Sequence, residues 1–129
     1  MIVKDCMRTE FATVGIEDTF QDVKEKLIER ETTVAIVRTR DGIAGMVTDT
    51  DVLAHSSAGK DLSQIKVKNR MTVCEIGGLN PCIQVFEESS VEEAAKIMAV
   101  SGVHHLLVWG KGGHISGVIS SLDILKTVD

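Results

Sequence analysis

The sequence predicts a mixed α/β fold, of the α+β kind, in which one structural unit occurs twice. Three observations predict it. Residues 43–53 recur as residues 115–125, 72 positions later, with four of eleven positions identical. The hydrophobic pattern of both halves gives the same order of elements: helix, strand, turn, strand, helix. Finally, 129 residues with 43% hydrophobic and 26% charged residues are typical of a globular chain, not of a disordered or fibrous one.

An amphipathic helix opens each repeat. Its apolar stripe consists of Phe20, Val23 and Leu27 in the first repeat. The corresponding stripe of the second repeat consists of Val91, Ala94, Ala95 and Met98. Both stripes have the spacing of a helix with one buried face. A capping box precedes each stripe, formed by Thr19 with Asp22 and by Ser90 with Glu93, so we expect the helices to begin there.

Two apolar strands joined by a glycine-containing turn follow each helix. We expect them at residues 34–37 and 43–47 in the first half and at residues 106–109 and 115–119 in the second. A short helix follows each pair, at residues 49–55 and 121–127. The polar linker at residues 55–61 then divides the chain into a first domain, 1–60, and a second domain, 61–129. Residues 72–81 contain Gly-Gly and Asn-Pro and are predicted to form an additional loop of the second half.

Composition and charge exclude several classes of protein. The formal net charge is −5 and aromatic residues make up 3%, which argues against nucleic-acid binding. No apolar stretch is long enough to span a membrane, and the N-terminus has no apolar signal region, so we expect a cytoplasmic protein with no membrane association.

The metal-ligating residue types are scattered. Three cysteines, Cys6, Cys74 and Cys82, form an odd number without a secretion signal, which predicts reduced thiols. Their spacing is not that of a zinc site, and the adjacent His104 and His105 would point to opposite faces of a strand. The sequence therefore predicts no metal site.

A motif ends the second strand of both halves: Gly, two apolar residues, Thr or Ser, two variable residues and Asp, at residues 45–51 and 117–123. Met7, the pair Met71 and Thr72, and residues 102–108 also fit a common pattern. Together these features resemble the CBS-domain pair, or Bateman module, over nearly the whole chain. The resemblance implies tandem CBS domains, two β-α-β-β-α units that are related by a pseudo-twofold axis and packed through their sheets.

The repeated motif carries the candidate binding chemistry. Thr48 and Ser120 stand where a strand enters a helix, and the N–H groups of a first helical turn can bind an anion. Asp51 and Asp123 follow three residues later on the same side, and a carboxylate can accept both hydroxyls of a ribose. The apolar residues that we expect to contact an adenine ring are Met46, Val47, Val118 and Ile119. The resemblance implies the same layout, with the base in clefts between the two halves.

The same residues can also be interpreted as helix caps without a ligand, because Thr48 with Asp51 and Ser120 with Asp123 have the pattern of capping boxes. Two features favour ligand binding. A capping box does not require a glycine three residues before the hydroxyl residue, and it usually has Glu or Gln in place of Asp. The duplicated glycine, at Gly45 in the first repeat, is therefore taken as a sign of a ligand site.

The charges differ between the two motifs. Many CBS pairs have a basic residue immediately before the motif Asp, where this chain has Thr50 and Leu122. Asp49 adds a negative charge to the first motif, whereas His104 aligns with a basic position that contacts phosphate in the family. We therefore expect a nucleotide at the second motif, and at the first either a less anionic ligand, such as the cationic S-adenosylmethionine, or no ligand.

These observations predict a stand-alone regulatory or sensory module. It requires no cofactor, binds AMP, ADP, ATP or S-adenosylmethionine, and relays binding to an effector protein by a population shift. The resemblance implies a homodimer, with an apolar helical face at Val52 and Leu53, or at Ile124 and Leu125, as the contact. The alternative is a protein-interaction or dimerisation module with no small ligand. The sequence offers no nucleophile–base set or metal set, so we do not expect an enzyme.

Overall fold

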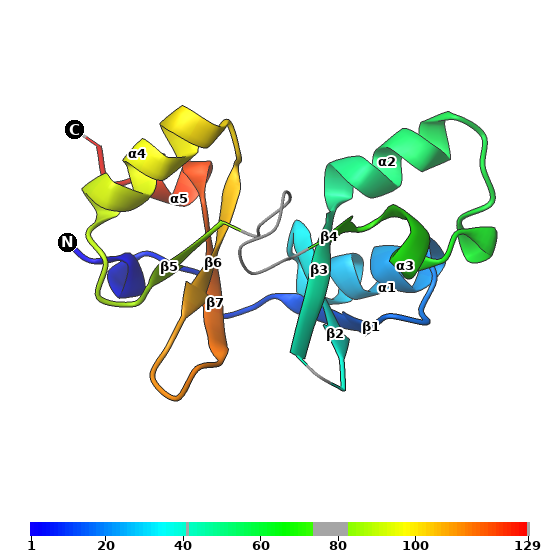
Figure 1. The fold of residues 1–129 in the computed structure, drawn as a ribbon. Helices are drawn as coiled ribbons and strands as arrows, with labels where there is room; N and C mark the ends of the chain where they lie inside the picture. The colour runs from blue at the N-terminus through cyan, green and yellow to red at the C-terminus, as the bar shows by residue number, and fades with distance from the viewer. Residues whose placement is uncertain (41, 74–82, 129) are drawn as a thin grey trace. The chain divides into compact units, whose positions relative to one another are not determined.

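The computed structural model describes residues 1–40, 42–73 and 83–128 (Figure 1). The chain forms two compact units. The N-terminal unit comprises Glu10–Cys82, and the C-terminal unit comprises Met1–Thr9 together with Ile83–Asp129. This division differs from the predicted domains 1–60 and 61–129, because the first nine residues pack with the second repeat.

The N-terminal unit contains a four-stranded sheet of order β1-β2-β3-β4. β1 is parallel to β2, whereas β2, β3 and β4 are successively antiparallel. The strands are β1 (Ala12–Gly15), β2 (Val34–Thr39), β3 (Gly42–Thr48) and β4 (Thr72–Val73). The helices are α1 (Phe20–Arg30), α2 (Asp49–Ser57), the 3-10 helix η2 (Leu62–Gln64) and α3 (Val67–Arg70). The predicted strands 34–37 and 43–47 and the predicted helix 49–55 are confirmed, with ends that differ by one or two residues.

The C-terminal unit repeats this plan with a three-stranded sheet of order β5-β6-β7. Its elements are η1 (Val3–Asp5), β5 (Gln84–Phe86), α4 (Val91–Ser101), β6 (His105–Trp109), β7 (Ile115–Ser120) and α5 (Ser121–Leu125). β5 is parallel to β6, and β6 is antiparallel to β7. The predicted α/β fold with two similar units is therefore confirmed. α5 ends two residues before the predicted end of the helix at residue 127.

The predicted helix starts have a clear physical basis. Thr19 accepts a hydrogen bond from the backbone N–H of Asp22, and the Asp22 carboxylate accepts one from the N–H of Thr19. This reciprocal capping box satisfies two of the N–H groups that a helix start leaves without partners. Ser90 likewise accepts from the N–H of Glu93 at 3.0 Å.

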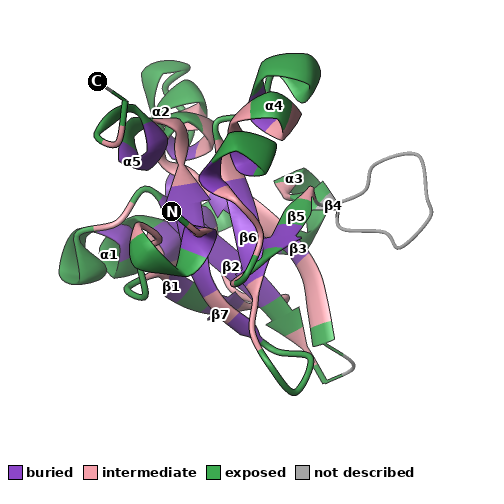
Figure 2. Cartoon of the chain, turned by 90° about the vertical axis from the view of Figure 1, so that its left-hand side faces the viewer, coloured by how far each residue is buried: buried purple, intermediate pink, exposed green. Residues whose placement is uncertain are grey.

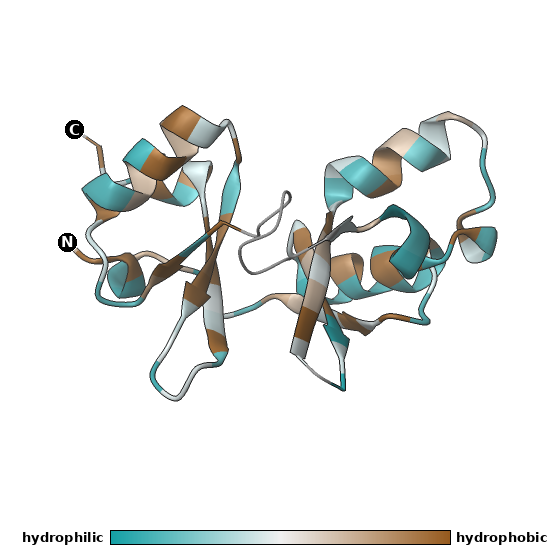
Figure 3. Ribbon diagram, in the orientation of Figure 1, coloured by the Kyte–Doolittle hydropathy of each residue, from teal (hydrophilic) through white to brown (hydrophobic). Residues whose placement is uncertain are grey.

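Each unit has its own core on the face of the sheet that its helices cover. In the N-terminal unit the predicted stripe of Phe20, Val23 and Leu27 is buried against strand residues that include Val37. The corresponding C-terminal core contains Val91, Ala94 and Met98 of α4, with Leu106, Val108 and Ile119 from the strands. Figure 2 shows this burial along the strands and on the inner sides of the helices, and Figure 3 shows the same positions as hydrophobic.

Two sequence expectations fall wholly or partly on residues that are not described. Cys74 and Cys82, expected to be reduced thiols, lie outside the described residues. So do residues 74–81 of the predicted additional loop, whose first two residues, Thr72 and Val73, form β4.

Candidate functional site

The first candidate site is the junction at which β3 passes into α2. Thr48 is the last residue of the strand and the N-cap of the helix. Its hydroxyl oxygen accepts a hydrogen bond from the N–H of Asp51 at 3.4 Å, and Oδ2 of Asp51 accepts one from the N–H of Thr48 at 2.9 Å. The capping box considered as the structural interpretation of this motif is therefore formed.

The second candidate site is the equivalent junction between β7 and α5. The hydroxyl of Ser120 accepts from the N–H of Asp123 at 3.2 Å, and Oδ2 of Asp123 accepts from the N–H of Ser120 at 2.9 Å. Both motifs thus hold a hydroxyl and a carboxylate at a strand exit. In each carboxylate, capping engages only one of the two oxygens.

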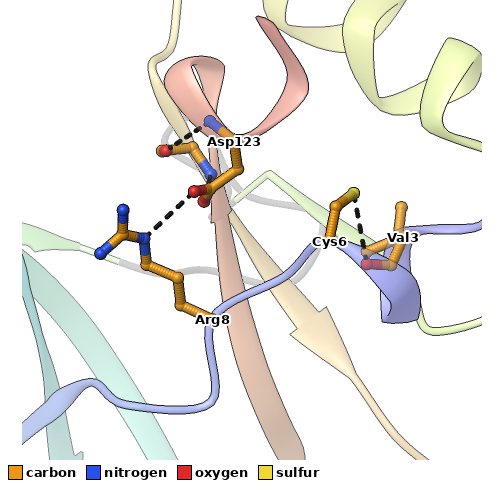
Figure 4. A network of polar contacts seen from close by, with 5 residues as sticks. Val3, Cys6, Arg8 and Asp123 are labelled. Atoms are coloured by element: carbon orange, nitrogen blue, oxygen red, sulfur yellow. Dashed lines mark hydrogen bonds and ion pairs between the residues drawn. The ribbon is translucent and has the colours of Figure 1, made fainter. Parts of the chain in front are cut away.

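The two carboxylates differ in what their other oxygen does. Oδ1 of Asp123 accepts a hydrogen bond from Nε of Arg8 at 3.1 Å, and this ion pair joins residues that are 115 positions apart (Figure 4). Asp123 is only 6% exposed, whereas the Arg8 side chain is 49% exposed. Asp51 is half-buried, and among the described residues no partner is found for its Oδ1. The first carboxylate therefore keeps a free acceptor in the described part of the chain, and the second is paired with a cation.

The first-turn N–H groups of α2 are already bonded within the protein. Asp49 donates its N–H to the carbonyl of Thr33 at 2.9 Å, and Thr50 donates its own to Oδ1 of Asp49 at 2.9 Å. The N–H of Asp51 is taken by Thr48. An anion at this junction would have to displace one of these bonds and would also face the charge of Asp49, so the geometry here disfavours phosphate.

The motif glycines have a packing role that the sequence did not reveal. A Cβ at Gly45 would lie 2.4 Å from the carbonyl oxygen of Thr72 and 2.9 Å from the sulfur of Met71. A Cβ at Gly117 would lie 2.6 Å from the carbonyl oxygen of Arg8. Both positions therefore need glycine because another backbone segment crosses there. Close packing alone therefore accounts for both glycines, and they are not evidence of a ligand site.

The apolar residues of the motifs fall on opposite faces of their strands. Val47 and Ile119 belong to the cores under the helices. Met46 and Val118, one position earlier, have side chains on the other face, because successive residues of a strand alternate. Of the four residues predicted to contact an adenine, these two lie outside the clusters under the helices, although Val118 is itself buried, at 4% exposed.

His104 lies just before β6 and is exposed. Its carbonyl accepts a hydrogen bond from the N–H of Ser121 at 2.9 Å, which ties the strand entry to the start of α5. The same bond joins Thr33 and Asp49 in the other unit. The backbone of His104 therefore has a structural role, and its side chain remains a candidate for ligand contact.

Arg8 is the site residue that sequence reasoning missed. It follows Met7, as Thr72 follows Met71, and both segments pair with the strand that carries the motif. Arg8 pairs with Val118, and Thr72 pairs with Met46. Extending the repeat alignment by one residue beyond the two methionines aligns Arg8 with Thr72, but it does not place Arg8 beside the second motif, because only the structure shows that the first nine residues pack with the second repeat.

Cys6 lies near this ion pair. Its thiol donates to the carbonyl of Val3 at 3.7 Å. Burial raises the pKa of the Cys6 thiol above its ordinary value, and the negative charges of Asp123 and Asp5 raise it further. The thiol is therefore kept in its protonated, less reactive form.

Within residues 1–40, 42–73 and 83–128, no three His, Cys, Asp or Glu side chains lie close enough to hold a metal ion. None of the helices described has the length and apolar character needed to cross a membrane.

Comparison with known proteins identifies the family. The family model of the CBS domain matches the chain twice, at residues 3–58 and 74–129. The chain belongs to the CBS domain family.

Two uncharacterised archaeal proteins are similar to it. The one from Methanopyrus kandleri is 27% identical over 126 residues, which cover 96% of this chain and 61% of that protein. The one from Methanocaldococcus jannaschii is 30% identical over 114 residues, covering 87% of this chain and 25% of that protein.

Solved structures of CBS proteins share this fold. A CBS domain protein from Pyrobaculum aerophilum, solved in complex with AMP, has a TM-score of 0.77 at 21% identity and covers 95% of this chain and 89% of its own. The CBS domain pair of protein MJ0100, solved with 5′-methylthioadenosine and S-adenosyl-L-methionine, has a TM-score of 0.79 at 18% identity, covering 98% of this chain and 94% of its own. A hexameric CBS-CP12 protein from bloom-forming cyanobacteria has a TM-score of 0.82 at 26% identity, covering 97% and 66%.

Proposed function

We propose that this CBS pair is a regulatory module that binds an adenosine-containing ligand at its two strand–helix junctions and relays binding to a partner protein, without catalysis of its own. One observation carries the proposal. Each unit fixes a hydroxyl and a carboxylate at the same strand exit, and neither carboxylate extends into bulk solvent, since Asp51 is half-buried and Asp123 is buried. Related CBS structures hold AMP, or methylthioadenosine and S-adenosylmethionine, which supports the ligand class.

The chemistry of the junctions fits a ribose. A carboxylate has about four lone-pair positions, and the capping bond uses one of them. Oδ1 of Asp51 is thus available to accept from a ribose hydroxyl, and the Thr48 hydroxyl of the same junction lies 2.9 Å from the hydroxyl of Thr50. Met46 and Val118 are the apolar residues that we assign to contact with the base.

Regulation by such a ligand requires a difference in affinity between two conformations. A ligand that binds one conformation about 10⁴-fold more tightly than the other can shift a two-state population from 1:99 to 99:1. The partner protein would then recognise the conformation that the ligand favours.

We also propose that the module acts as a homodimer. In the N-terminal unit, α1, α2 and η2 surround an apolar pocket of about 370 Å³ whose lining includes Leu27, Ile28, Val52 and Leu53. Val52 is buried in its own core, while Leu53 is 63% exposed. Leu125 of α5 is 64% exposed. Leu53 and Leu125 are therefore the residues we assign to the contact between copies, and sedimentation of Leu53→Glu against the unchanged chain tests this assignment.

A thermal-shift series tests the ligand proposal. The unchanged chain is heated with adenosine, AMP, ADP, ATP or S-adenosylmethionine. At 100 times its dissociation constant, a bound ligand stabilises the folded state by about 2.7 kcal/mol. The double variant Asp51→Asn, Asp123→Asn is the control, since asparagine keeps an oxygen that can accept the capping hydrogen bond but loses the charge. We expect a shift in the unchanged chain and none in the double variant.

The same thermal-shift series tests the alternative, a protein-interaction module that binds no small ligand. If no adenosine compound shifts the transition, the carboxylates have structural roles only, as caps and, for Asp123, as the partner of Arg8, and the chain is an interaction module without a small ligand. That outcome would be consistent with the capping boxes, which both carboxylates form.

A further inference from the structure

We propose that Arg8 is the specificity-determining residue of the Ser120–Asp123 junction and that it selects ligands carrying a phosphate. This inference rests on the proposed function, because it assigns different ligand chemistry to the two adenosine sites. It concerns a residue outside the strand–helix motif.

Arg8 is held in place by its backbone. Its N–H donates to the carbonyl of Val118 at 2.8 Å, and its carbonyl accepts from the N–H of Val118 at 2.9 Å. Gly117 permits this approach, since any side chain there would collide with the carbonyl of Arg8. The guanidinium therefore starts from a backbone position that is fixed beside β7.

The side chain is oriented by a single bond. Nε donates to Oδ1 of Asp123 at 3.1 Å, and Figure 4 shows the two terminal nitrogens beyond it, turned away from the carboxylate. Among the described residues no partner is found for these nitrogens, and the side chain is 49% exposed. The guanidinium thus uses its inner N–H for positioning and keeps its outer N–H groups available.

The outer N–H groups suit a phosphate. Arginine presents N–H donors in a rigid planar fork that matches phosphate oxygens, and the bonds are charge-assisted. A ribose bound at Asp123 would bring its 5′ substituent close to the guanidinium that is bonded to the same carboxylate. Arg8 therefore supplies a cation at a junction whose own first helical turn, residues 121–123, contains none.

The Thr48–Asp51 junction has no arginine in the equivalent position. Thr72 occupies the place of Arg8, opposite Met46. Asp49 adds a negative charge at the start of α2, where the second junction has the uncharged Ser121. The first junction therefore favours adenosine compounds without a phosphate, and the second favours nucleotides.

Calorimetric titration with AMP and with adenosine tests the assignment. The chain carries Asp51→Asn throughout, so that the second junction dominates binding. In this background we compare Arg8 with Arg8→Gln and Arg8→Lys. The matched control is Lys4→Gln, which removes one exposed positive charge from the same N-terminal segment. The measured quantity is the ratio of the AMP affinity to the adenosine affinity.

We expect Arg8→Gln to lower this ratio about tenfold or more, the effect of losing a charge-assisted hydrogen bond. Lys4→Gln should leave the ratio unchanged, and Arg8→Lys should retain part of it, because lysine keeps the charge without the fork. If Arg8→Gln does not fold, Arg8→Lys alone decides, and an unchanged ratio there overturns the inference. Binding with an equal ratio in Arg8→Gln and Lys4→Gln also overturns it while leaving the proposed function intact. If the unchanged chain binds neither compound nor S-adenosylmethionine, both proposals fall.

Discussion

Replacing Gly117 by alanine tests how closely the N-terminal segment packs on β7. The added Cβ would lie 2.6 Å from the carbonyl oxygen of Arg8 and 2.8 Å from the sulfur of Met7. The sulfur can move, but the carbonyl belongs to backbone that is bonded twice to Val118, at 2.8 and 2.9 Å. Relieving the contact must therefore lengthen or break those hydrogen bonds.

The expected cost follows from two contributions. Overpacking in a closely packed region costs about 1–3 kcal/mol. Weakening two backbone hydrogen bonds adds about 1 kcal/mol for each bond that is lost. We expect Gly117→Ala to lower the free energy of unfolding by about 2–4 kcal/mol, and Gly45→Ala to do the same, because its Cβ would lie 2.4 Å from the carbonyl oxygen of Thr72.

Urea denaturation measures this change, and Gly15→Ala is the matched control. Gly15 also lies in a strand, but a Cβ there would meet only Asp18, at 3.7 Å, an ordinary contact. Its substitution should change the free energy of unfolding by no more than about 0.5 kcal/mol. If Gly117→Ala proves as stable as Gly15→Ala, the packing account of the motif glycines is wrong.

Three further predictions concern stability and reactivity. Asp123→Asn should lower the free energy of unfolding by about 1 kcal/mol or more beyond the effect of Asp51→Asn, because only Asp123 is buried and pairs with Arg8. The midpoints of urea denaturation measure this difference, and equal midpoints would refute it. Glu31→Gly should raise the free energy of unfolding by about 0.5–1 kcal/mol, because Glu31 ends α1 with φ of 50°, a left-handed conformation that glycine adopts without strain. Thermal denaturation measures this change, and a lower melting temperature in the variant would contradict it. The pKa of Cys6 is raised in the folded chain, so its protonated thiol stabilises the fold below the unfolded thiol pKa, and this contribution is lost as the pH rises through the folded pKa. Alkylation of Cys6 at pH 8–9, measured by peptide mass spectrometry, should therefore be slower in the folded chain than in the unfolded chain.

The elements of both repeats could be predicted because their signals are local. Apolar residues at helical spacing marked α1 and α4, and capping residues such as Thr19 marked their starts. The strands were bounded by glycine-containing turns. Each of these features depends on residues within a few positions of one another, so a single sequence contains them.

The ion pair between Arg8 and Asp123 could not be predicted in this way. Its members are 115 positions apart, and no periodic pattern connects them. The same limit explains the motif glycines. The sequence displays Gly45 and Gly117 next to a hydroxyl and a carboxylate, but the backbone that crosses them comes from a distant segment. A sequence pattern cannot distinguish a glycine kept for a ligand from one kept for a neighbouring strand.

The division into units illustrates a related limit. The sequence repeat places the boundary near residue 60, where a polar linker begins. In the structure the segment Met1–Thr9 packs with the second repeat, where Val3 donates its N–H to the carbonyl of Ser89 at 2.8 Å. The segment that contains β4 correspondingly pairs with β3 of the first repeat. Such an exchange leaves the local pattern unchanged, so only long-range contacts reveal it.

A titration of the ¹⁵N-labelled chain with AMP and S-adenosylmethionine, followed by amide chemical shifts, tests most directly whether the paired strand exits are ligand sites. The account predicts saturable shifts that concentrate at residues 48–51 and 120–123, with AMP acting mainly on the second group. Shifts confined to other parts of the chain, or none at millimolar concentrations of either compound, would contradict it.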